Sequence, residues 1–333
     1  MKEIAERADV SVATVSRVLN NHANVRESVR ERVMAVIEEI GYEPDPIARS
    51  LRTQATFTIG FIVRDLVDTV FSTMAQGVDN VLREHGYTVL LSTSSRDPER
   101  DAHQLAMLRS RRVDGFILAI SEESSPALIA EVRKTSRPIV LLDREMEGTA
   151  TDAVLTDYLS GTRDAIAYLA SLGHRRIAYI GGTLAIRPGR ERLRAFTTAM
   201  RETGIEPDPE LVRTGSFAQE FGSSVCHELL NLTEPPTALL AAGNQIAVGV
   251  LQTLRERAVR VPDDRSLICI DDVDLLRYGN PPVTVISRPF ERIGELAANR
   301  LLERIRTPEA TEHQQIFVPT NLVIRSSCRS ITP

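Results

Sequence analysis

The strongest constraint on the fold is an alternation of short apolar runs with helical stretches, which begins at Phe57 and covers most of the chain. The apolar runs predict buried strands in two series, at residues 58–63, 87–93, 114–120, 138–143 and 153–157, then at 176–182, 210–215, 237–242 and 266–272. Predicted helices separate them at 72–85, 98–112, 158–172, 188–203, 219–231 and 244–257. Continuous apolar strands that alternate with helices are typical of parallel sheets covered on both faces. We therefore expect an α/β core of two doubly wound parallel-sheet lobes.

The first 21 residues predict two short helices around a tight turn. Ser11 can cap the second helix by accepting a hydrogen bond from a free backbone N–H. Val15, Val18 and Leu19 share one face of that helix. The opposite face carries Val12, Ala13, Ser16 and Arg17. This arrangement fits a helix-turn-helix whose second helix enters the DNA major groove, and it equally fits an ordinary helical hairpin.

A third helix is predicted between residues 25 and 41, and it would complete a small three-helix core. Its apolar stripe consists of Val29, Val33, Val36, Ile37 and Ile40. Gly41 suits a left-handed C-cap. Asp45 before Pro46 then starts a helix of barely two turns, which is marginal on its own. At the other end, Met1 lies in the first helical turn with no capping residue before it, which predicts a frayed helix start or a translation start further upstream.

Three segments, SVATVSRVLN, ERVMAVIEEIGYEPDPIARSLRT and TIGFIV, follow one another in register. Together they resemble the lactose-repressor (LacI/GalR) family of transcriptional regulators, and the resemblance continues to about Arg325. It implies an N-terminal all-α helix-turn-helix domain at 1–44, a hinge helix and linker at 45–57, and a periplasmic-binding-protein-like core at 58–325. The implied lobes are an N-lobe of about 58–157 plus 290–319 and a C-lobe of about 158–288 plus 321–326. The chain would cross between them near 157–161, 287–291 and 319–322.

The resemblance also implies a function: a sequence-specific DNA-binding regulator, acting as a repressor on a palindromic operator. Base reading falls to Val12, Ala13 and Arg17, of which Arg17 can pair bidentately with guanine. Phosphate contacts fall to Thr14, Ser16 and Asn20. Leu51, beside Ala48 and Arg49, corresponds to the family's minor-groove wedge.

Operator affinity would be switched by a small carbohydrate-like effector that binds between the lobes, at the C-terminal ends of the strands. The effector-binding residues implied by the resemblance are Phe71, Asp143, Arg192, Phe217, Asn244 and Asp271. Three of them have a structural alternative: Asp143 as a polar strand-end residue, Arg192 as half of a lobe salt bridge, and Phe217 as a core residue.

Two departures from the family pattern bear on the effector. Gly243 stands where a polar side chain is frequent, and Phe71 is one aromatic residue where the family tends to have two. Arg187 and Arg190 lie close to Arg192 in the sequence. They favour an acidic or phosphorylated sugar, or else form a solvated arginine cluster, so a sugar, a sugar acid and a sugar phosphate all remain open.

Charge does not mark the N-terminal domain as a DNA-binding one, because residues 1–57 carry eight basic and nine acidic side chains. Placement matters more, since Arg17 lies on the second helix while Glu38, Glu39 and Glu43 lie at the end of the third helix or beyond. We therefore expect modest nonspecific affinity for DNA.

Other functional classes lack their motifs. The chain has no phosphate-binding glycine loop and no nucleophile elbow, and its six histidines do not cluster, so we expect no enzyme, no cofactor and no metal. A stand-alone sugar-binding protein would need a signal peptide and would not carry residues 1–53. No apolar run is long enough for a membrane span, and the scattered Cys226, Cys269 and Cys328 fit a reducing cytoplasm, where the protein would act at the nucleoid. The last residues form no apolar heptads, which favours a homodimer over a tetramer held by a coiled coil.

Overall fold

The computed structural model describes residues 1–19, 24–41, 55–95, 97–309 and 312–331. Internal contacts divide the chain into two units, Met1–Thr56 and Phe57–Pro333, and each is described by itself. Asn20, Ala48, Arg49 and Leu51 of the predicted DNA-binding set lie outside the described residues, as does the predicted hinge helix that begins at Asp45.

The first unit contains three described helices: α1 (Lys2–Arg7), α2 (Val12–Leu19) and α3 (Glu27–Ile40). They enclose a small apolar core whose buried members are Ile4, Ala5, Ala8, Val15, Val18, Val33 and Val36. The predicted stripes on α2 and α3 supply four of these residues, which confirms the assignment of the inward faces. The core includes residues from all three helices, so the alternative prediction of an ordinary two-helix hairpin describes this unit only in part.

Both predicted caps of this unit are present. Ser11 Oγ accepts a hydrogen bond from the Thr14 backbone N–H at 3.1 Å, at the start of α2. Gly41 ends α3 with φ of 59°, in the left-handed region that favours glycine. Met1 precedes α1 and makes no side-chain capping bond. The ends of these helices were therefore predictable from local sequence.

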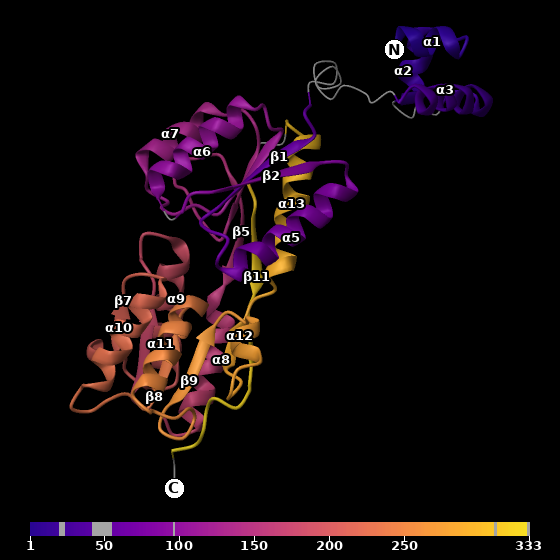
Figure 1. The fold of residues 1–333 in the computed structure, drawn as a ribbon. Coiled ribbons are helices and arrows are strands. Elements are labelled where there is room, and N and C mark those ends of the chain that lie inside the picture. Colours follow the sequence, from indigo (N-terminus) through magenta and orange to yellow (C-terminus); the bar gives the residue numbers. More distant parts are fainter. Residues whose placement is uncertain (20–23, 42–54, 96, 310–311, 332–333) are drawn as a thin grey trace. The chain divides into compact units, whose positions relative to one another are not determined.

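The second unit consists of two lobes, each built on a six-stranded sheet (Figure 1). We name the lobe that contains β1 the first lobe; its strand order is β11-β5-β4-β3-β1-β2. Its strands are β1 (Thr58–Val63), β2 (Thr88–Thr93), β3 (Gly115–Leu118), β4 (Ile139–Leu142), β5 (Asp152–Asp157) and β11 (Gln315–Pro319). Its helices are α5 (Thr69–Glu84), α6 (Pro98–Ser110), α7 (Pro126–Lys134) and α13 (Phe290–Arg306). All strand pairs of this sheet are parallel, as predicted.

The second lobe has the strand order β12-β10-β9-β8-β6-β7. Its strands are β6 (Ile177–Gly181), β7 (Val212–Thr214), β8 (Ala238–Ala241), β9 (Ser266–Ile270), β10 (Thr284–Ser287) and β12 (Asn321–Val323). Its helices are α8 (Tyr158–Ser171), α9 (Arg187–Glu202), α10 (Gln219–Leu230), α11 (Asn244–Glu256) and α12 (Asp274–Arg277), with a 3-10 turn at Pro209–Leu211. The sheet is parallel, as predicted, except at one edge, where β12 runs antiparallel to β10.

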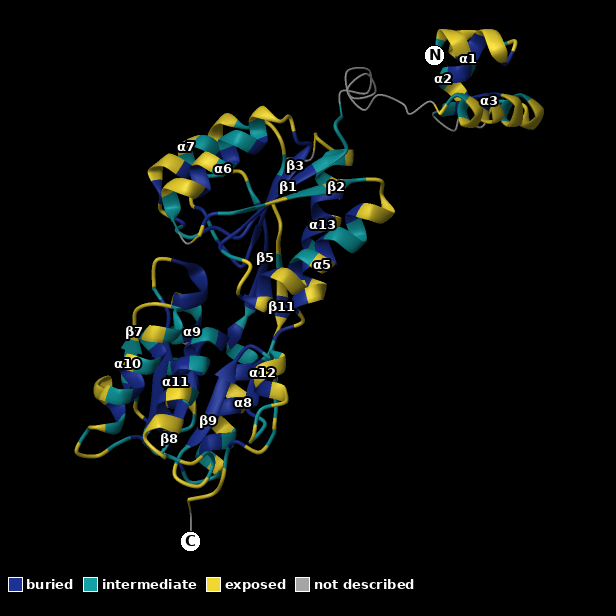
Figure 2. Cartoon of the chain, viewed as in Figure 1, coloured by how far each residue is buried: buried dark blue, intermediate teal, exposed yellow. Residues whose placement is uncertain are grey.

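Helices pack in pairs on the two faces of each sheet: α5 with α13 and α6 with α7 in the first lobe, α8 with α9 and α10 with α11 in the second. The inner strands of both sheets are buried almost throughout, whereas the edge strands β2, β7, β11 and β12 are partly exposed and the helices expose their outer faces (Figure 2). Two apolar clusters per lobe lie between sheet and helices. This arrangement explains why the strands are continuous apolar runs and the helices are amphipathic.

The chain passes between the two sheets at three places: from β5 to α8, from β10 to α13, and from β11 to β12. Thr320, between β11 and β12, ties two of these crossings together, since its hydroxyl accepts from Gly161 N at 3.0 Å and donates to Asp157 O at 2.8 Å. A Cβ on Gly161 would lie 2.7 Å from Ile286 Cγ2 and from Thr320 Oγ1, so only glycine allows the crossings to lie this close.

Candidate functional site

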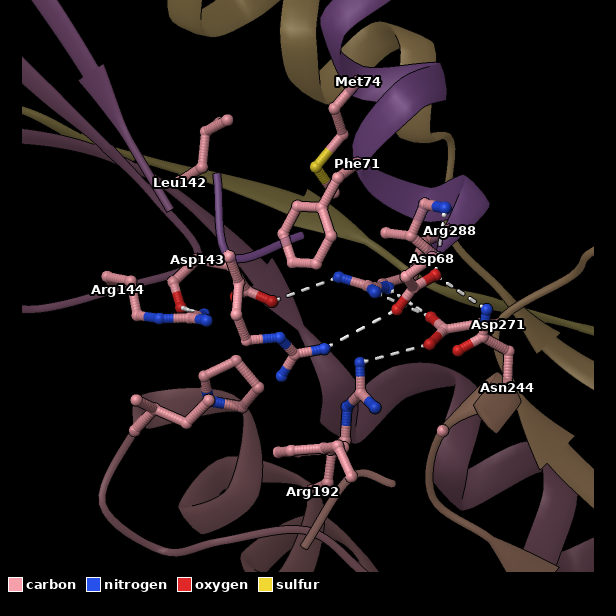
Figure 3. Close-up of a pocket in the computed structure, with 16 residues that line it drawn as sticks. Asp68, Phe71, Met74, Leu142, Asp143, Arg144, Arg192, Asn244, Asp271 and Arg288 are labelled. Carbon is pink, nitrogen blue, oxygen red and sulfur yellow. Dashed lines mark hydrogen bonds and ion pairs between the residues drawn. The ribbon is translucent and has the colours of Figure 1, made fainter. Parts of the chain in front are cut away.

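The six predicted effector-binding residues all line one cavity in the second unit, between the carboxyl ends of strands from both lobes. Asp143 directly follows β4, and Asp271 directly follows β9. Both have positive φ, 52° for Asp143 and 94° for Asp271. Arg192 lies on α9, Asn244 begins α11, and Figure 3 shows all four side chains around the cavity.

Asp143 has no free carboxylate oxygen in this arrangement. Arg187 Nη1 pairs with Oδ1 at 3.0 Å, and Arg288 Nη1 pairs with Oδ2 at 3.1 Å. The Tyr158 hydroxyl donates a short hydrogen bond to Oδ2, and Thr156 N donates to Oδ1 at 3.1 Å. Burial alone would raise the pKa of Asp143, but Arg288 and Arg187 outweigh it and hold this pKa below its ordinary value.

Asp271 shares one of these arginines. Arg288 Nε donates to Asp271 Oδ1 at 2.7 Å, and Arg192 Nη2 lies 3.5 Å from Oδ2. Arg288 therefore joins an aspartate of the first lobe to an aspartate of the second (Figure 3). It lies in the crossing between β10 and α13, where a side chain can reach both lobes.

A second network crosses the cleft at Asp68, the N-cap of α5. Asn244 Nδ2 donates to Asp68 Oδ1 at 2.8 Å, which links the lobes again. Arg64 Nη2 lies 3.6 Å from Asp68 Oδ2. Burial raises the pKa of Asp68, and the Asn244 hydrogen bond only partly offsets this.

Both predicted aromatic residues lie close to the guanidinium of Arg64. Its guanidinium carbon is 5.3 Å from the Phe71 ring centroid and 5.6 Å from that of Phe217, within cation–π range. Phe217 packs against backbone, because a Cβ on Gly182 would lie 2.2 Å from its ring. A Cβ on Gly243 would lie 3.2 Å from the same ring. The missing side chain at position 243 thus leaves room for Phe217.

The interpretation of Arg187 and Arg190 as a solvated cluster is wrong for Arg187, which is only 4% exposed. Its backbone N–H donates to Glu123 Oε1 at 2.8 Å, in addition to its ion pair with Asp143. Arg190 is half-exposed and pairs with Glu123 Oε2 at 2.6 Å. Both arginines therefore hold α9 against carboxylates of the first lobe.

Sequence reasoning missed several residues of the cleft. The cavity lining also includes Arg64, Asp68, Arg144 and Arg288, and it encloses about 50 Å³. Tyr158 is not part of the lining but binds two lining residues, because its hydroxyl donates to Asp143 Oδ2 and accepts from Arg192 Nη2 at 3.1 Å. One sequence signal was available for Arg288, because it falls in a predicted crossing between lobes.

The predicted DNA-reading face of α2 lies opposite its buried face. Val12 is 42% exposed, Ala13 and Arg17 are exposed, and Thr14 and Ser16 are half-buried. Val15 and Val18 point into the core. This separation gives α2 one apolar side for packing and one accessible side with a single arginine.

The described residues bring together no group of three or more His, Cys, Asp or Glu side chains that could hold a metal ion. Among the helices that the structure describes, none combines the length and apolar character that a membrane crossing needs.

Comparisons with known proteins agree with this architecture. Residues 1–45 match the bacterial regulatory proteins of the lacI family, and residues 166–328 match the periplasmic binding protein-like domain. The HTH-type transcriptional repressor CytR of Escherichia coli (strain K12) is 32% identical over 331 residues, 99% of this chain and 96% of that protein. The HTH-type transcriptional repressor PurR of Klebsiella pneumoniae (strain 342) is 36% identical over 330 residues, 98% of this chain and 96% of that protein.

Solved structures extend the similarity to the whole fold. The lac repressor dimer bound to operator and the anti-inducer ONPF superimposes with a TM-score of 0.85 at 27% identity, over 98% of both chains. A complex of the transcriptional regulator CelR with cellobiose superimposes with a TM-score of 0.74 at 30% identity, over 97% of this chain and 98% of that one. With a helix-turn-helix unit, two doubly wound lobes and full-length relatives above 30% identity, the chain belongs to the LacI family of bacterial regulatory proteins.

Proposed function

We propose that this protein is a transcriptional repressor that binds palindromic operator DNA as a homodimer and is switched by a small polar effector in the cleft of Figure 3. The main support for the proposal is that a single chain combines an accessible face of α2 with a charged cavity between two lobes. Its relatives are named repressors, and the lac repressor structure is a dimer on its operator. The effectors named in relatives' structures include cellobiose and ribose. In this proposal the protein works in the cytoplasm, at the nucleoid.

On the DNA side, Arg17 supplies the direct hydrogen bonds to a guanine edge, while Val12 and Ala13 contact base methyls or shape. Thr14, Ser16 and Asn20 contact phosphates, and the hinge residues Ala48, Arg49 and Leu51 act in the minor groove. In this proposal few side chains of α2 contact bases directly, and a wedge at Leu51 that bends the duplex would add to their recognition of the operator.

On the effector side, Asp143, Arg192, Asn244 and Asp271 bind polar groups of the ligand, with Phe71 and Phe217 beside it. In the structure these side chains bind one another across the lobes through Arg288 and Asp68. A ligand that replaces such contacts favours one separation of the lobes over another. Differential affinity of this kind shifts the population that is competent to bind DNA.

The DNA part is tested by a gel shift with the region upstream of the gene. Wild-type protein should retard that fragment specifically, and Arg17→Ala should weaken binding by about 10- to 100-fold, the usual cost of one lost bidentate base contact. Arg32→Ala, an exposed arginine of α3, is the control and should bind within about threefold of wild type. Tight, salt-insensitive binding to random DNA would contradict the proposal.

The effector part is tested by adding metabolites to the same assay. Arg192→Lys keeps a buried positive charge beside Asp271 but loses the planar fork that pairs with two oxygens. We expect this variant to keep operator affinity and to need at least about tenfold more effector for the same response. An unchanged response would remove Arg192 from the binding site.

A further inference from the structure

We propose that the effector carries an oxyanion, a carboxylate or a phosphate, and that Arg144 is the residue that binds it. This inference rests on the proposed effector cleft and specifies the class of ligand that enters it. The charged residues of the cavity lining are four arginines and three aspartates, namely Arg64, Arg144, Arg192 and Arg288, and Asp68, Asp143 and Asp271.

Three of the four arginines are paired with aspartates. Arg64 lies 3.6 Å from Asp68, Arg192 lies 3.5 Å from Asp271, and Arg288 pairs with two aspartates at 3.1 and 2.7 Å. Arg144 differs, since no carboxylate of the described residues lies within 4 Å of its guanidinium. The cavity therefore contains one arginine whose charge has no direct counterion.

Arg144 is nevertheless buried, at 3% exposure. Its guanidinium donates to two backbone carbonyls, from Nε to Ile120 O at 2.7 Å and from Nη1 to Asp143 O at 2.9 Å. These bonds orient the side chain beside Asp143 at the edge of the cavity (Figure 3). They leave Nη2 with no hydrogen bond to the described part of the chain. Carbonyl dipoles fix the geometry, but they do not neutralise the charge.

Three carboxylates attract the charge of Arg144, those of Asp143, Glu123 and Asp101, and each of them also binds other groups. Asp143 is saturated by Arg187, Arg288, Tyr158 and Thr156, as described above. Glu123 pairs with Arg190 and accepts from two backbone N–H groups, those of Glu145 and Arg187.

The third neighbour, Asp101, accepts from Ser121 N at 2.7 Å, and burial raises its pKa. Burial has the opposite effect on the cation and lowers the pKa of Arg144, as expected where nearby negative charge does not offset the burial.

A ligand oxyanion would provide the missing counterion. An ionised carboxylate or phosphate accepts charge-assisted hydrogen bonds from a guanidinium, which are about twice as strong as neutral ones. A neutral sugar hydroxyl offers no such compensation and would have to compete with Arg187 and Arg288 for Asp143. The lining therefore favours a sugar acid or a sugar phosphate over the neutral sugar.

The test compares matched ligands on the full-length protein by thermal shift and calorimetry. Each set contains a neutral aldose, its sugar acid and its phosphate ester, and inorganic phosphate is the minimal probe, with chloride at equal ionic strength as its control. We expect at least one acid or phosphate to bind about tenfold or more tightly than its neutral parent. Whether the acid or the phosphate binds more tightly identifies the oxyanion.

Arg144→Met should remove this preference by weakening the anionic ligand about tenfold or more while leaving neutral parents within about threefold. Arg144→Lys, which retains the charge, should keep part of the preference and serves if the methionine variant does not fold. Arg133→Met changes an exposed arginine of α7 in the same lobe and should bind every ligand as wild type does.

Three results would overturn the inference: neutral and anionic members that bind wild type equally, no response of wild type to any anionic probe, or unchanged anion affinity in Arg144→Met. Its failure is separable from that of the proposed function. Release of operator by a neutral sugar would leave the repressor function standing and refute the oxyanion, whereas absence of specific operator binding would refute the repressor function.

Discussion

The first unit and the cleft of the second unit differ in where their charged side chains lie. In the first unit, the ion pair between Arg7 and Glu3 leaves 46% and 63% of the two side chains exposed, and the buried side chains among its described residues are all apolar. In the cleft, the ion pair between Arg288 and Asp271 leaves only 4% of each side chain exposed. An exposed pair is replaced by water at little cost, whereas a buried pair must be replaced by another partner. The first arrangement suits a surface of constant shape, and the second suits a switch that responds to a ligand.

The largest effect should come from a charge in the small core of the first unit. Val15→Asp would bury an unpaired carboxylate, at a cost of about 3–5 kcal/mol. A unit of this size has a stability of roughly 3–8 kcal/mol, so the change should unfold it and abolish operator binding. Calorimetry should show the transition of the second unit unchanged.

The control for that variant is Val12→Asp, on the exposed face of the same helix. It should leave the first unit folded. If Val15→Asp were also folded, the apolar core would not be what holds these helices together.

A similar loss of stability, this time in the second unit, is expected for Arg288→Met. Removing this arginine leaves Asp143 and Asp271 short of a counterion in a buried site, which costs about 3–5 kcal/mol and should affect the second unit alone. Arg292→Met removes an arginine four residues along the chain whose pair with Glu295 is exposed, and it should cost less than about 1 kcal/mol. Urea denaturation of both variants measures the difference, and equal losses would refute the distinction between buried and exposed pairs.

A pH effect of intermediate size should be confined to the second unit. His174 is buried between Thr237, Ser266 and the Arg329 carbonyl, and burial lowers its pKa. The unfolded chain therefore binds a proton near pH 6.5 that the folded chain does not, so stability falls as the pH drops below about 6.5. This single group contributes a slope of at most about 1.4 kcal/mol per pH unit.

His174→Gln should remove that slope between about pH 6.5 and 5.5. His227→Gln, a partly exposed histidine near Glu256, should retain it. An unchanged slope in His174→Gln would assign the pH dependence to other groups.

The smallest expected effect concerns the cap of α2. Ser11→Ala removes the acceptor for Thr14 N and should destabilise the first unit by about 1 kcal/mol. Ser11→Asp keeps an acceptor and should retain most of the stability. Thermal unfolding of the first unit checks both, and equal melting temperatures for serine and alanine would show that the cap does not stabilise it.

Much of the fold was predictable because its signals are local. The caps at Ser11 and Gly41 act within a few residues, and the strands and helices follow from hydrophobic period. The missed strands β10, β11 and β12 contain four, five and three residues, so their length alone does not separate them from predicted strands such as β7. The antiparallel direction of β12 comes from the chain's last crossing. A three-residue strand has no period of its own, so its pairing depends on where the rest of the sheet lies.

The cleft likewise has features that the sequence predicted and features that it could not predict. The amino-acid sequence by itself, with its family resemblance, determined which strand and helix ends face the cavity, because the carboxyl ends of parallel strands share one edge of a sheet. Their role in binding an effector stays a prediction. Only the tertiary structure decided which charges meet, since Arg288 lies 145 residues from Asp143 and Asn244 lies 176 residues from Asp68. No local pattern encodes such pairs, and for the same reason no local pattern could indicate that Arg144 would be buried with no carboxylate of the described residues within 4 Å of its guanidinium.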